Sequence, residues 1–479
     1  MRWLIVEDSL QGRGGHWFEY LGDFCRELPR LGDEVTLLVS RRAEPFIREQ
    51  LGGQPVLPES AYGKMSDGAP VWRRYARIPI HAWKTFRAVR RYLRTAPEPD
   101  VIFVPTVIVH HLLAWAALVK LGLKRGNARV LLFFPGLPIR RGIHAAVLDG
   151  SPTSKLVRKL LRWLGPEIRA GKVILGVETH AMKQAAEQAF GLPFTYFPHP
   201  VHATKIESRN SKSEIGDRRS EVGNAEKKYG KQKEEIAESE TYQVSGQWSV
   251  VSGPSSDLRS PSSELRTSNS ELLTMACYGP ARHEKGSEVL TAAMEQHLAR
   301  FPNSRSRFVL QWLKDFSTAS GGTAHLPATL RQHPRVEIVD HYFADGEYAQ
   351  RLASTQALLL PYRRLSYALR VSRVVIEAMV HGLPVVATRG TTLAEQAEEF
   401  GAAVLCEDEN VESLVAAIEK TEQNYAALAA RACERQAKAR EHFSVRQFRE
   451  ALMSKAEIRK VESRKRLEQQ RNKDTKLKR

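Results

Sequence analysis

The chain has 479 residues, 42% of them hydrophobic, and a formal net charge of +18 at pH 7. A hydrophobic share of this size is typical of globular proteins, and the length allows two or three domains with a large core. The positive charge, with a pI near 9.8, indicates an anionic partner such as a nucleoside diphosphate, an acidic membrane surface or a nucleic acid.

The cysteine pattern and the start of the chain indicate a cytoplasmic protein. Four cysteines lie far apart and show neither CxxC nor metal-ligand spacing, so a reducing compartment is expected. Glu7 and Asp8 interrupt the first apolar run, which argues against a secretory signal. The longest apolar stretch, 101–123, contains Pro105, His110 and His111, and we expect a strand, a turn and a helix there rather than a membrane span.

The first part of the chain, residues 1–203, predicts a doubly wound parallel sheet. A strand at 3–6 is followed by a loop that contains Gly14 and Gly15, a helix at 16–31 and a strand at 35–39. The same order of strand, loop and helix recurs to the end of this part. The later strands are expected at 100–104, 129–134, 173–177 and 194–197.

Two segments of this part combine basic and aromatic residues. The segment 72–94 contains no acidic residue, and its lysines and arginines are interleaved with Trp72, Trp83 and Phe86. The segment 155–164 has the same character at helical spacing. Either segment can be a surface helix with a solvated basic face, or a helix that lies on an anionic bilayer.

Residues 204–270 differ in character from the rest. They are rich in Ser, Glu, Lys and Asn and poor in aliphatic residues, and they contain short repeats with Leu258, Leu265 and Leu272 about one heptad apart. A coiled coil needs more heptads and a second apolar position. We therefore expect a low-complexity, disordered insertion with no catalytic role.

Residues 271–443 predict a second domain of the same class. An apolar strand at 272–278 leads into a loop with Arg282 and Lys285 and then into a helix at 287–300. Two cations above a helix N-terminus suit a diphosphate. Further strands are expected at 308–312, 336–339 and 404–406, and a helical stretch at 410–442. Residues 444–479 are expected to form a helix that crosses back to the first domain, followed by a basic tail.

The stretch 358–388 is the centre of this domain. Its first strand closes at Pro361, Ser372 is a candidate N-cap, Glu377 lies inside the helix, Gly382 ends it, and the next strand is at 385–388. The loop and the helix N-terminus then lie at the carboxyl end of the strands, where ligands bind in open α/β sheets. The surrounding arginines make this a candidate phosphate site, and they are Arg363, Arg364, Arg370 and Arg373.

This stretch also resembles a known signature. The pattern consists of Pro361, Tyr362, Tyr367, Arg370, Ser372, Glu377, Ala378, Gly382 and Pro384. It resembles the donor site of retaining family four glycosyltransferases, the glycosyl transferases group 1 type. The resemblance implies a GT-B fold, with two Rossmann-like domains facing a cleft. In most members a first glutamate precedes Glu377 by about two turns. Leu369 stands at that position, so the hydrogen bonds that this glutamate gives the donor sugar are missing.

The resemblance assigns roles to individual residues. Arg282 and Lys285 would bind the donor diphosphate and stabilise the leaving group, and Glu377 would bind the ribose hydroxyls. A wider donor-binding set is implied, made up of Gly14, Gly15, Tyr342, Tyr367, Arg370, Ser372, Val374, Thr391 and Thr392. Many members have a histidine in the cleft that contacts the donor sugar, and no histidine follows the expected strand here. The nearest substitutes are His110, His111 and His144. A structural or surface role is favoured for each of them.

The expected reaction is transfer of a sugar from a nucleotide-diphosphate donor to an acceptor with retention of configuration. No Asp-x-Asp motif accompanies the site, so neither a metal nor another cofactor is expected. Arg282, Lys285 and the helix dipole would balance the negative charge of the donor diphosphate. The basic surface would suit an acceptor of the cell envelope, either a glycan or a lipid, as in polysaccharide biosynthesis. It would also suit peripheral contact with the inner face of the cytoplasmic membrane.

Two other functions stay open. The first is a catalytically inactive GT-B protein that binds an anionic membrane or a nucleic acid. Leu369 in place of the glutamate would favour this interpretation, although no nucleic-acid-binding module is recognisable. The second is an epimerase or hydrolase of nucleotide sugars, which needs carboxylates and a histidine that converge in the cleft.

Overall fold

The computed structural model describes residues 1–12, 17–60, 71–122, 128–141, 146–201, 272–344 and 346–454. The chain divides into two compact units, Met1–Thr204 with Asn269–Arg479, and Lys205–Ser268. The predicted insertion at 204–270 and the predicted tail beyond residue 454 lie outside the described residues, as do Gly14, Gly15 and His144.

The first part of the chain forms a seven-stranded sheet in the order β3-β2-β1-β4-β5-β8-β9. Every pair of neighbouring strands in it is parallel. The strands are β1 (Arg2–Glu7), β2 (Glu34–Ser40), β3 (Gln54–Leu57), β4 (Val101–Val104), β5 (Arg129–Phe133), β8 (Val173–Val177) and β9 (Thr195–Tyr196). The predicted doubly wound parallel sheet is confirmed.

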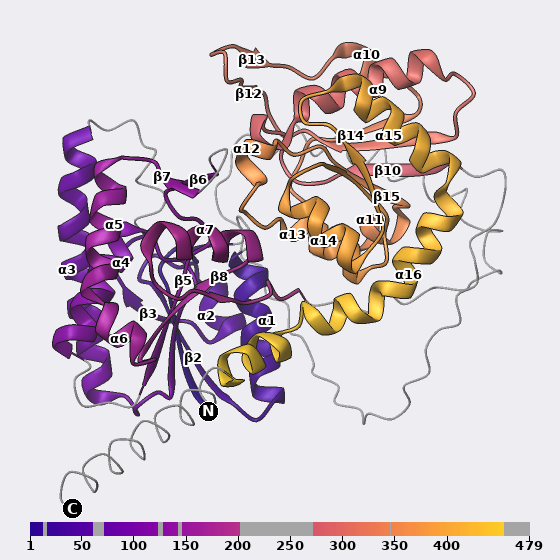
Figure 1. The fold of residues 1–479 in the computed structure, drawn as a ribbon. Helices are drawn as coiled ribbons and strands as arrows, with labels where there is room; N and C mark the ends of the chain where they lie inside the picture. The colour runs from indigo at the N-terminus through magenta and orange to yellow at the C-terminus, as the bar shows by residue number, and fades with distance from the viewer. Residues whose placement is uncertain are drawn as a thin grey trace, which may run out of the picture. The chain divides into compact units, whose positions relative to one another are not determined.

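Helices cover both faces of this sheet, because side chains alternate along each strand. Leu4 and Val6 of β1 pack into one core and Trp3 and Ile5 into the other. Figure 1 shows α3, α4, α5 and α6 on one side of the sheet and α1 on the other, and residues of the first four helices belong to the first core. The helices are α1 (Trp17–Arg30), α2 (Pro45–Leu51), α3 (Val71–Thr95), α4 (Val109–Ala117), α5 (Pro152–Trp163), α6 (Gly165–Arg169) and α7 (His180–Phe190).

The apolar stretch 101–123 forms β4, then α4, then the short helix η2 (Leu118–Gly122), as the sequence predicts. Among the described residues, no helix is both long enough and apolar enough to cross a membrane. A small antiparallel hairpin, β6 (Ile139–Arg141) with β7 (Ala146–Leu148), follows β5.

The second part forms a six-stranded parallel sheet in the order β14-β11-β10-β15-β16-β17. Its strands are β10 (Leu273–Cys277), β11 (Ser306–Gln311), β14 (Val336–Val339), β15 (Ala357–Leu360), β16 (Val385–Thr388) and β17 (Ala403–Cys406). The pair β12 (Phe316–Ser317) and β13 (Thr323–Ala324) stands apart from this sheet.

Short helices connect these strands. They are η3 (His283–Lys285), α9 (Ser287–Arg300), α10 (Ala328–Gln332), α11 (Glu347–Ser354), α12 (Arg364–Tyr367), α13 (Arg373–Val380) and α14 (Thr392–Phe400). The helical stretch predicted at 410–442 is two helices, α15 (Val411–Gln423) and α16 (Tyr425–His442). Asn424 separates them, with φ −110° and ψ 18°, and its side-chain amide donates to the Lys420 carbonyl.

Residues 445–454 are helical and pack against the first sheet. The Phe448 side chain is fully buried, with ring centroids 4.9 Å from Phe24, 5.3 Å from Phe103 and 4.7 Å from Phe197. Arg449 pairs with Asp33 at 2.7 Å. The C-terminal segment therefore completes the core of the first domain.

Candidate active site

Two loops at the carboxyl ends of the neighbouring strands β10 and β15 are bound to each other. The Arg363 amide donates to the Glu284 carbonyl at 3.1 Å, and its Nε donates to the His283 carbonyl at 2.9 Å. Gly286 has a φ of +64°, and a Cβ there would lie 2.1 Å from the Pro361 carbonyl oxygen. Only glycine allows the backbones to approach this closely. The contact places the Arg282–Lys285 loop beside the loop that leads into α13.

The two predicted cations of this loop differ in environment. The Lys285 ammonium lies 5.7 Å from the centre of the buried Tyr362 ring, close to Gly279. Burial lowers the pKa of Lys285 to about 8. The Arg282 side chain is 57% exposed and lies 3.5 Å from the Glu284 carboxylate. One cation is therefore desolvated and fixed in place, and the other can swing toward an incoming anion.

Helix α13 begins and ends where the sequence predicts. Ser372 is its N-cap, with extended backbone and no side-chain cap hydrogen bond. His381 is the C-cap, and Gly382 follows with a φ of +69°. Ser372 is buried, and the amides of the first turn after it have no partner within the helix. The N-terminus of α13 is thus the positive end of a helix dipole next to the β10 loop.

Glu377 is buried in α13, and both its oxygens have partners. Oε1 accepts from Nε of Arg373 at 2.8 Å, and Oε2 accepts from the Tyr348 hydroxyl. Arg373 also lies 3.5 Å from Asp23 and 3.5 Å from Glu19, both in α1. Burial, together with the Glu377 charge, raises the pKa of Tyr348 well above its usual range, so the phenol stays protonated. Glu377 is the centre of a buried polar network.

Several predicted phosphate-binding arginines already have protein partners. Arg373 serves the carboxylates described above, and Arg363 pairs with Glu409. Arg370 is exposed, and so is Arg364, whose guanidinium lies 4.0 Å from the Asp408 carboxylate. The phosphate-binding role predicted for this group is therefore open to Arg364 and Arg370, with Arg282 and Lys285 from the other loop, while Arg373 is an ion-pair residue.

The hydroxyls of Thr391 and Thr392 organise backbone. Thr391 is the N-cap of α14, where its Oγ1 accepts from the Ala394 amide at 3.2 Å and donates to the Thr388 carbonyl at 2.7 Å. The Thr392 hydroxyl bonds the carbonyls of Tyr367 and Arg370. Thr391 therefore fixes the start of α14, and Thr392 holds the loop before α13 in place.

The remaining predicted donor residues lie in different settings. The Tyr367 ring packs 4.7 Å from the Tyr362 ring. Val374 is partly buried and packs on the core of the second domain. Tyr342 is 75% exposed. The structure therefore brings Tyr367 to the Lys285–Tyr362 contact, while Tyr342 lies on the open surface.

Leu369 is a contact to the first domain. Its side chain packs against the core over α3–α6, and its carbonyl accepts a 2.7 Å hydrogen bond from the Thr179 hydroxyl. Thr179 is also the N-cap of α7, as predicted. The position at which the sequence resemblance predicts a glutamate is thus occupied by an apolar side chain that connects the two sheets.

The sequence analysis did not identify Tyr348, Asp23 and Glu19 as partners of the α13 network. They are distant in sequence, and no motif marks them. It also did not identify His81, which meets the buried His111 and Asp8 at the carboxyl end of the first sheet. A histidine inside a basic, aromatic helix carries no signal of such a contact.

Comparison with known proteins agrees with this arrangement. Residues 273–424, the second domain, match the family described as glycosyl transferases group 1. A search of curated proteins finds no match to the chain.

Solved structures with a similar fold extend over nearly the whole chain. A glycosyltransferase from Rickettsia africae superposes with a TM-score of 0.56 at 13% identity, covering 96% of this chain and 98% of its own. HepE from Anabaena, in complex with UDP-glucose, gives a TM-score of 0.52 at 13% identity, covering 95% and 99%. Sucrose-phosphate synthase from Thermosynechococcus elongatus gives 0.51 at 14% identity, covering 97% and 99%. The two-sheet architecture is therefore the GT-B fold.

Proposed function

We propose that this chain, which has the GT-B fold and matches the glycosyl transferases group 1 family at residues 273–424, is a glycosyltransferase that transfers a sugar from a nucleotide-diphosphate donor with retention of configuration. The observation that carries the proposal is the contact between the β10 and β15 loops, which brings the Lys285 ammonium over Tyr362 next to the α13 N-terminus. A group with two phosphates is the ligand that this arrangement would stabilise.

The chemistry follows from charge. As the bond between the sugar and the diphosphate breaks, negative charge grows on the leaving phosphate. A desolvated ammonium and helix-terminal amides, held in place before the reaction, stabilise that charge more than mobile water does. Lys285 and the backbone at Ser372 would supply this effect, and Arg282 would close on the diphosphate. Because Lys285 and Arg282 would balance the charge of the leaving diphosphate, we propose that the transfer step needs no metal at the donor site.

Glu377 would bind the ribose hydroxyls of the donor. Its carboxylate already accepts from Arg373 and Tyr348, so a ribose hydroxyl would either add to this network or displace the phenol. The acceptor is proposed to be a glycan or a lipid. HepE, with a similar fold, was solved with UDP-glucose, which makes UDP-sugars the first donors to test.

The test is a thermal-shift panel of UDP, GDP and ADP with their common sugar conjugates. At a ligand concentration about 100 times the Kd, binding should add about 2.7 kcal/mol of stability. One nucleotide family should raise the Tm of the wild type and not that of Arg282→Ala or Lys285→Ala. Arg300→Ala is the matched control, because Arg300 ends α9, the helix that follows the Arg282–Lys285 loop, and pairs with Glu412 on the surface. If no nucleotide shifts the wild type, the donor-site proposal fails.

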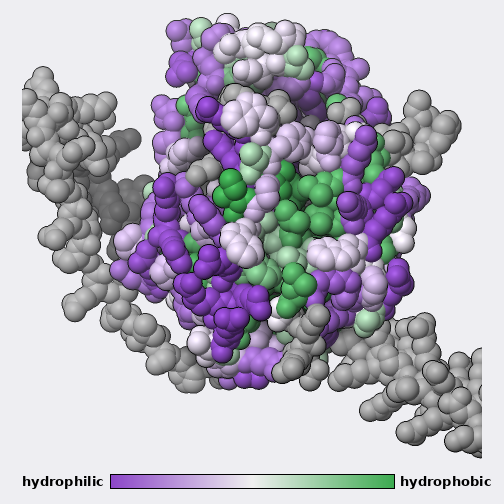
Figure 2. Space-filling view, turned by 90° about the vertical axis from the view of Figure 1, so that its left-hand side faces the viewer, coloured by the Kyte–Doolittle hydropathy of each residue, from purple (hydrophilic) through white to green (hydrophobic). Residues whose placement is uncertain are grey.

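We further propose that the protein attaches to an anionic membrane through one surface of the first domain. This α3–α5 surface consists of the exposed apolar residues Trp72, Tyr75, Ile80, Trp83, Leu121 and Trp163, with exposed basic residues between them. Figure 2 faces the side where α3 lies in Figure 1 and shows apolar and hydrophilic side chains intermixed there. Neither α3 nor α5 contains an acidic residue.

Physical chemistry supports a bilayer as the partner. Trp72, Ile80 and Trp83 follow one another at helical spacing on an exposed side of α3, next to the side that buries Ala82 and Val89. Tryptophan prefers the interface between lipid headgroups and acyl chains, and arginine binds anionic headgroups. The Tyr75 hydroxyl lies 3.5 Å from the Thr153 hydroxyl, which places the start of α3 beside the start of α5.

Co-sedimentation with vesicles tests this proposal. The full-length protein should bind vesicles that contain phosphatidylglycerol, bind phosphatidylcholine vesicles weakly, and dissociate as salt rises. Trp72→Ala/Trp83→Ala should weaken binding, while Leu272→Ala, which removes an exposed apolar side chain outside the surface, should not. Membrane attachment through this surface would be contradicted if the protein bound both vesicle types equally. It would also be contradicted if the double variant bound vesicles as well as the wild type.

A further inference from the structure

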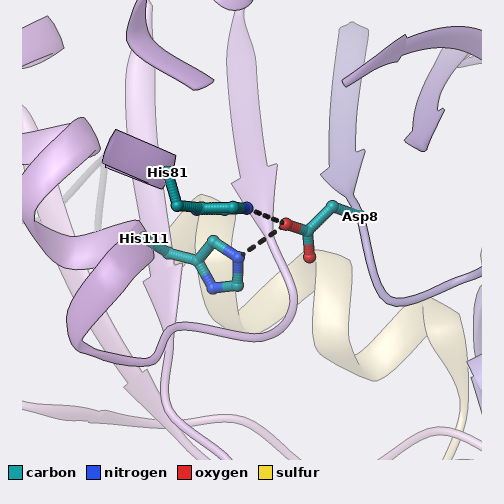
Figure 3. Close-up of side chains that lie close together, drawn as sticks. All are labelled: Asp8, His81 and His111. Atoms are coloured by element: carbon teal, nitrogen blue, oxygen red, sulfur yellow. Dashed lines mark hydrogen bonds and ion pairs between the residues drawn. The ribbon is translucent and has the colours of Figure 1, made fainter. Parts of the chain in front are cut away.

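Three buried side chains of the first domain converge at the carboxyl end of its sheet. Asp8 follows β1, His81 lies in α3 and His111 lies in α4 (Figure 3). The Nε2 atoms of His81 and His111 each lie 3.0 Å from the same oxygen, Oδ2 of Asp8. The side chains are 4%, 11% and 6% exposed, in the order Asp8, His81, His111. Asp8 and His111 are 103 residues apart in the sequence.

The basic residues that lie against these carboxyl groups are histidines. Glu7 is 2% exposed and Asp8 4% exposed, so two adjacent carboxyl groups are buried together. Within the described part of the chain, His81 and His111 pair with Asp8, and no lysine or arginine forms an ion pair with either carboxyl group. Buried carboxylates are normally compensated by a cation, because isolated charge is strongly disfavoured away from water. A bound divalent cation would provide this compensation in place of protons on the two histidines.

The histidine nitrogens are available to such a cation. Nε2 of His81 lies close to Asp8 but outside the geometry of a hydrogen bond, and Nδ1 has no partner. Nδ1 of His111 accepts a 3.5 Å hydrogen bond from the Ile108 amide, and Nε2 is hydrogen-bonded to Oδ2 of Asp8 at 3.0 Å. A cation would replace the proton that Nε2 and Asp8 share, while the backbone contact at the other nitrogen orients the ring.

We propose that Asp8, His81 and His111 bind a divalent transition-metal cation, of which Zn²⁺ suits the site best. One carboxylate oxygen and two imidazole nitrogens are ligands that Zn²⁺ prefers. The three ligand atoms lie within 4.8 Å of one another. Tetrahedral bonds of about 2.0–2.1 Å require ligand atoms about 3.4 Å apart. The two 3.0 Å separations therefore need to widen by only a few tenths of an ångström.

The role of this site is structural. The adjoining cavity has a volume of about 10 Å³ and is lined by Glu7, Asp8, Thr85 and His111, among others. This is room for one water molecule as a fourth ligand and too little for a sugar. The cation would join the end of β1 to α3 and α4, and so hold the helix of the α3–α5 surface on the sheet. The site belongs to the first domain, and its proposal does not depend on the donor chemistry of the second.

The test is made on the full-length protein after removal of any affinity tag. The metal-stripped protein should take up one equivalent of Zn²⁺, measured by elemental analysis after gel filtration. Co²⁺ should bind with the visible absorption bands of a low-symmetry nitrogen and oxygen site, and Zn²⁺ should raise the Tm where Mg²⁺ does not. His81→Ala and His111→Ala should weaken Zn²⁺ binding by more than about 100-fold, because each removes a direct ligand.

The controls separate this site from surface binding. His325→Ala removes an exposed histidine paired with Asp315 and should leave the Zn²⁺ stoichiometry unchanged. If the alanine variants do not fold, His81→Gln replaces the imidazole with an amide and tests the same ligand. The proposal is wrong if the wild type takes up no stoichiometric Zn²⁺, or if the His81 variants bind it as tightly as the wild type. The three side chains would then form a hydrogen-bonded cluster only.

Discussion

Nε of Arg373 lies 2.8 Å from Oε1 of Glu377, one turn further along α13, and the Tyr348 hydroxyl bonds the other carboxylate oxygen. The carboxylate is therefore held from two sides inside the second domain. Because Asp23 and Glu19 also face Arg373, the same network reaches α1 of the first domain. Glu377, for which the sequence resemblance predicts binding of the donor ribose, is here part of the contact between domains.

Glu377→Ala should destabilise the protein strongly. It leaves Arg373 buried with only the longer contacts to Asp23 and Glu19, and breaking a buried ion pair typically costs about 3–5 kcal/mol. Tyr348→Phe removes one hydrogen bond to a charged group, worth about 1.5–3 kcal/mol. Because the two residues share that bond, the effects of the two variants on the urea unfolding midpoint should not add. Strictly additive effects would contradict the network.

Donor binding should depend on pH through Lys285. Its pKa is lowered from 10.5 to about 8 by burial, so the folded protein loses this proton before the unfolded chain does. The unfavourable buried charge is fully present below pH 8 and is relieved as pH rises toward 10.5, so this group makes stability increase with pH in that window. A bound diphosphate would restore the protonated form, so affinity should fall above pH 8.

Isothermal titration in buffers of different ionisation enthalpy measures the proton taken up with the donor. The ligand is the nucleotide sugar that raises the Tm in the panel above. Near pH 9 the wild type should take up a fraction of a proton on binding. Lys285→Arg stays charged throughout and should bind with no uptake. The same uptake in this variant would assign the proton to another group.

Gly286→Ala should damage the donor site. The residue has a φ of +64°, and the added Cβ would meet the Pro361 carbonyl at 2.1 Å. Gly191→Ala is a matched control, since Gly191 has a φ of +66° with no atom within 4 Å of the added Cβ. Both variants carry the cost of the left-handed conformation, about 1–2 kcal/mol. Only Gly286→Ala should lose a further ~1–3 kcal/mol of stability from the clash. This variant should also show no rise in Tm when nucleotide is added.

Equal melting temperatures for Gly286→Ala and Gly191→Ala would show that the β10 and β15 loops separate easily. The contact described between Gly286 and Pro361 would then not hold the Lys285 loop in place. Nucleotide titrations on both variants distinguish a loss of folding from a loss of binding.

Phe448→Ala should destabilise the first domain, although Phe448 comes after the second domain in sequence. The ring lies among Phe24, Phe103 and Phe197, and removing a buried phenylalanine costs about 3–5 kcal/mol. Differential scanning calorimetry should show a lower transition temperature. Phe316→Ala, at a partly exposed β12 position, should change it much less. A similar loss in both variants would contradict a core role for the C-terminal segment.

Local patterns in the sequence were enough to predict much of the fold. The apolar runs at 173–177 and 385–388 are strands with those bounds, and the caps at Thr179 and Ser372 lie at the predicted residues. Such features depend on neighbouring residues and on the period of burial, which a single sequence displays. The two doubly wound sheets follow from the regular alternation of these elements. Asn424, which interrupts the helical stretch, has no such pattern around it.

Sequence alone thus determined the class of fold and the position of many of its strands and helix caps. The tertiary structure alone decided which side chains meet: Glu377 with Tyr348 and Arg373, Leu369 with the first domain, and Asp8 with His81 and His111. The reason is physical. Caps and strands arise from contacts between near neighbours in the chain, whereas these partners come from separate elements and are brought together only when the sheets and helices pack.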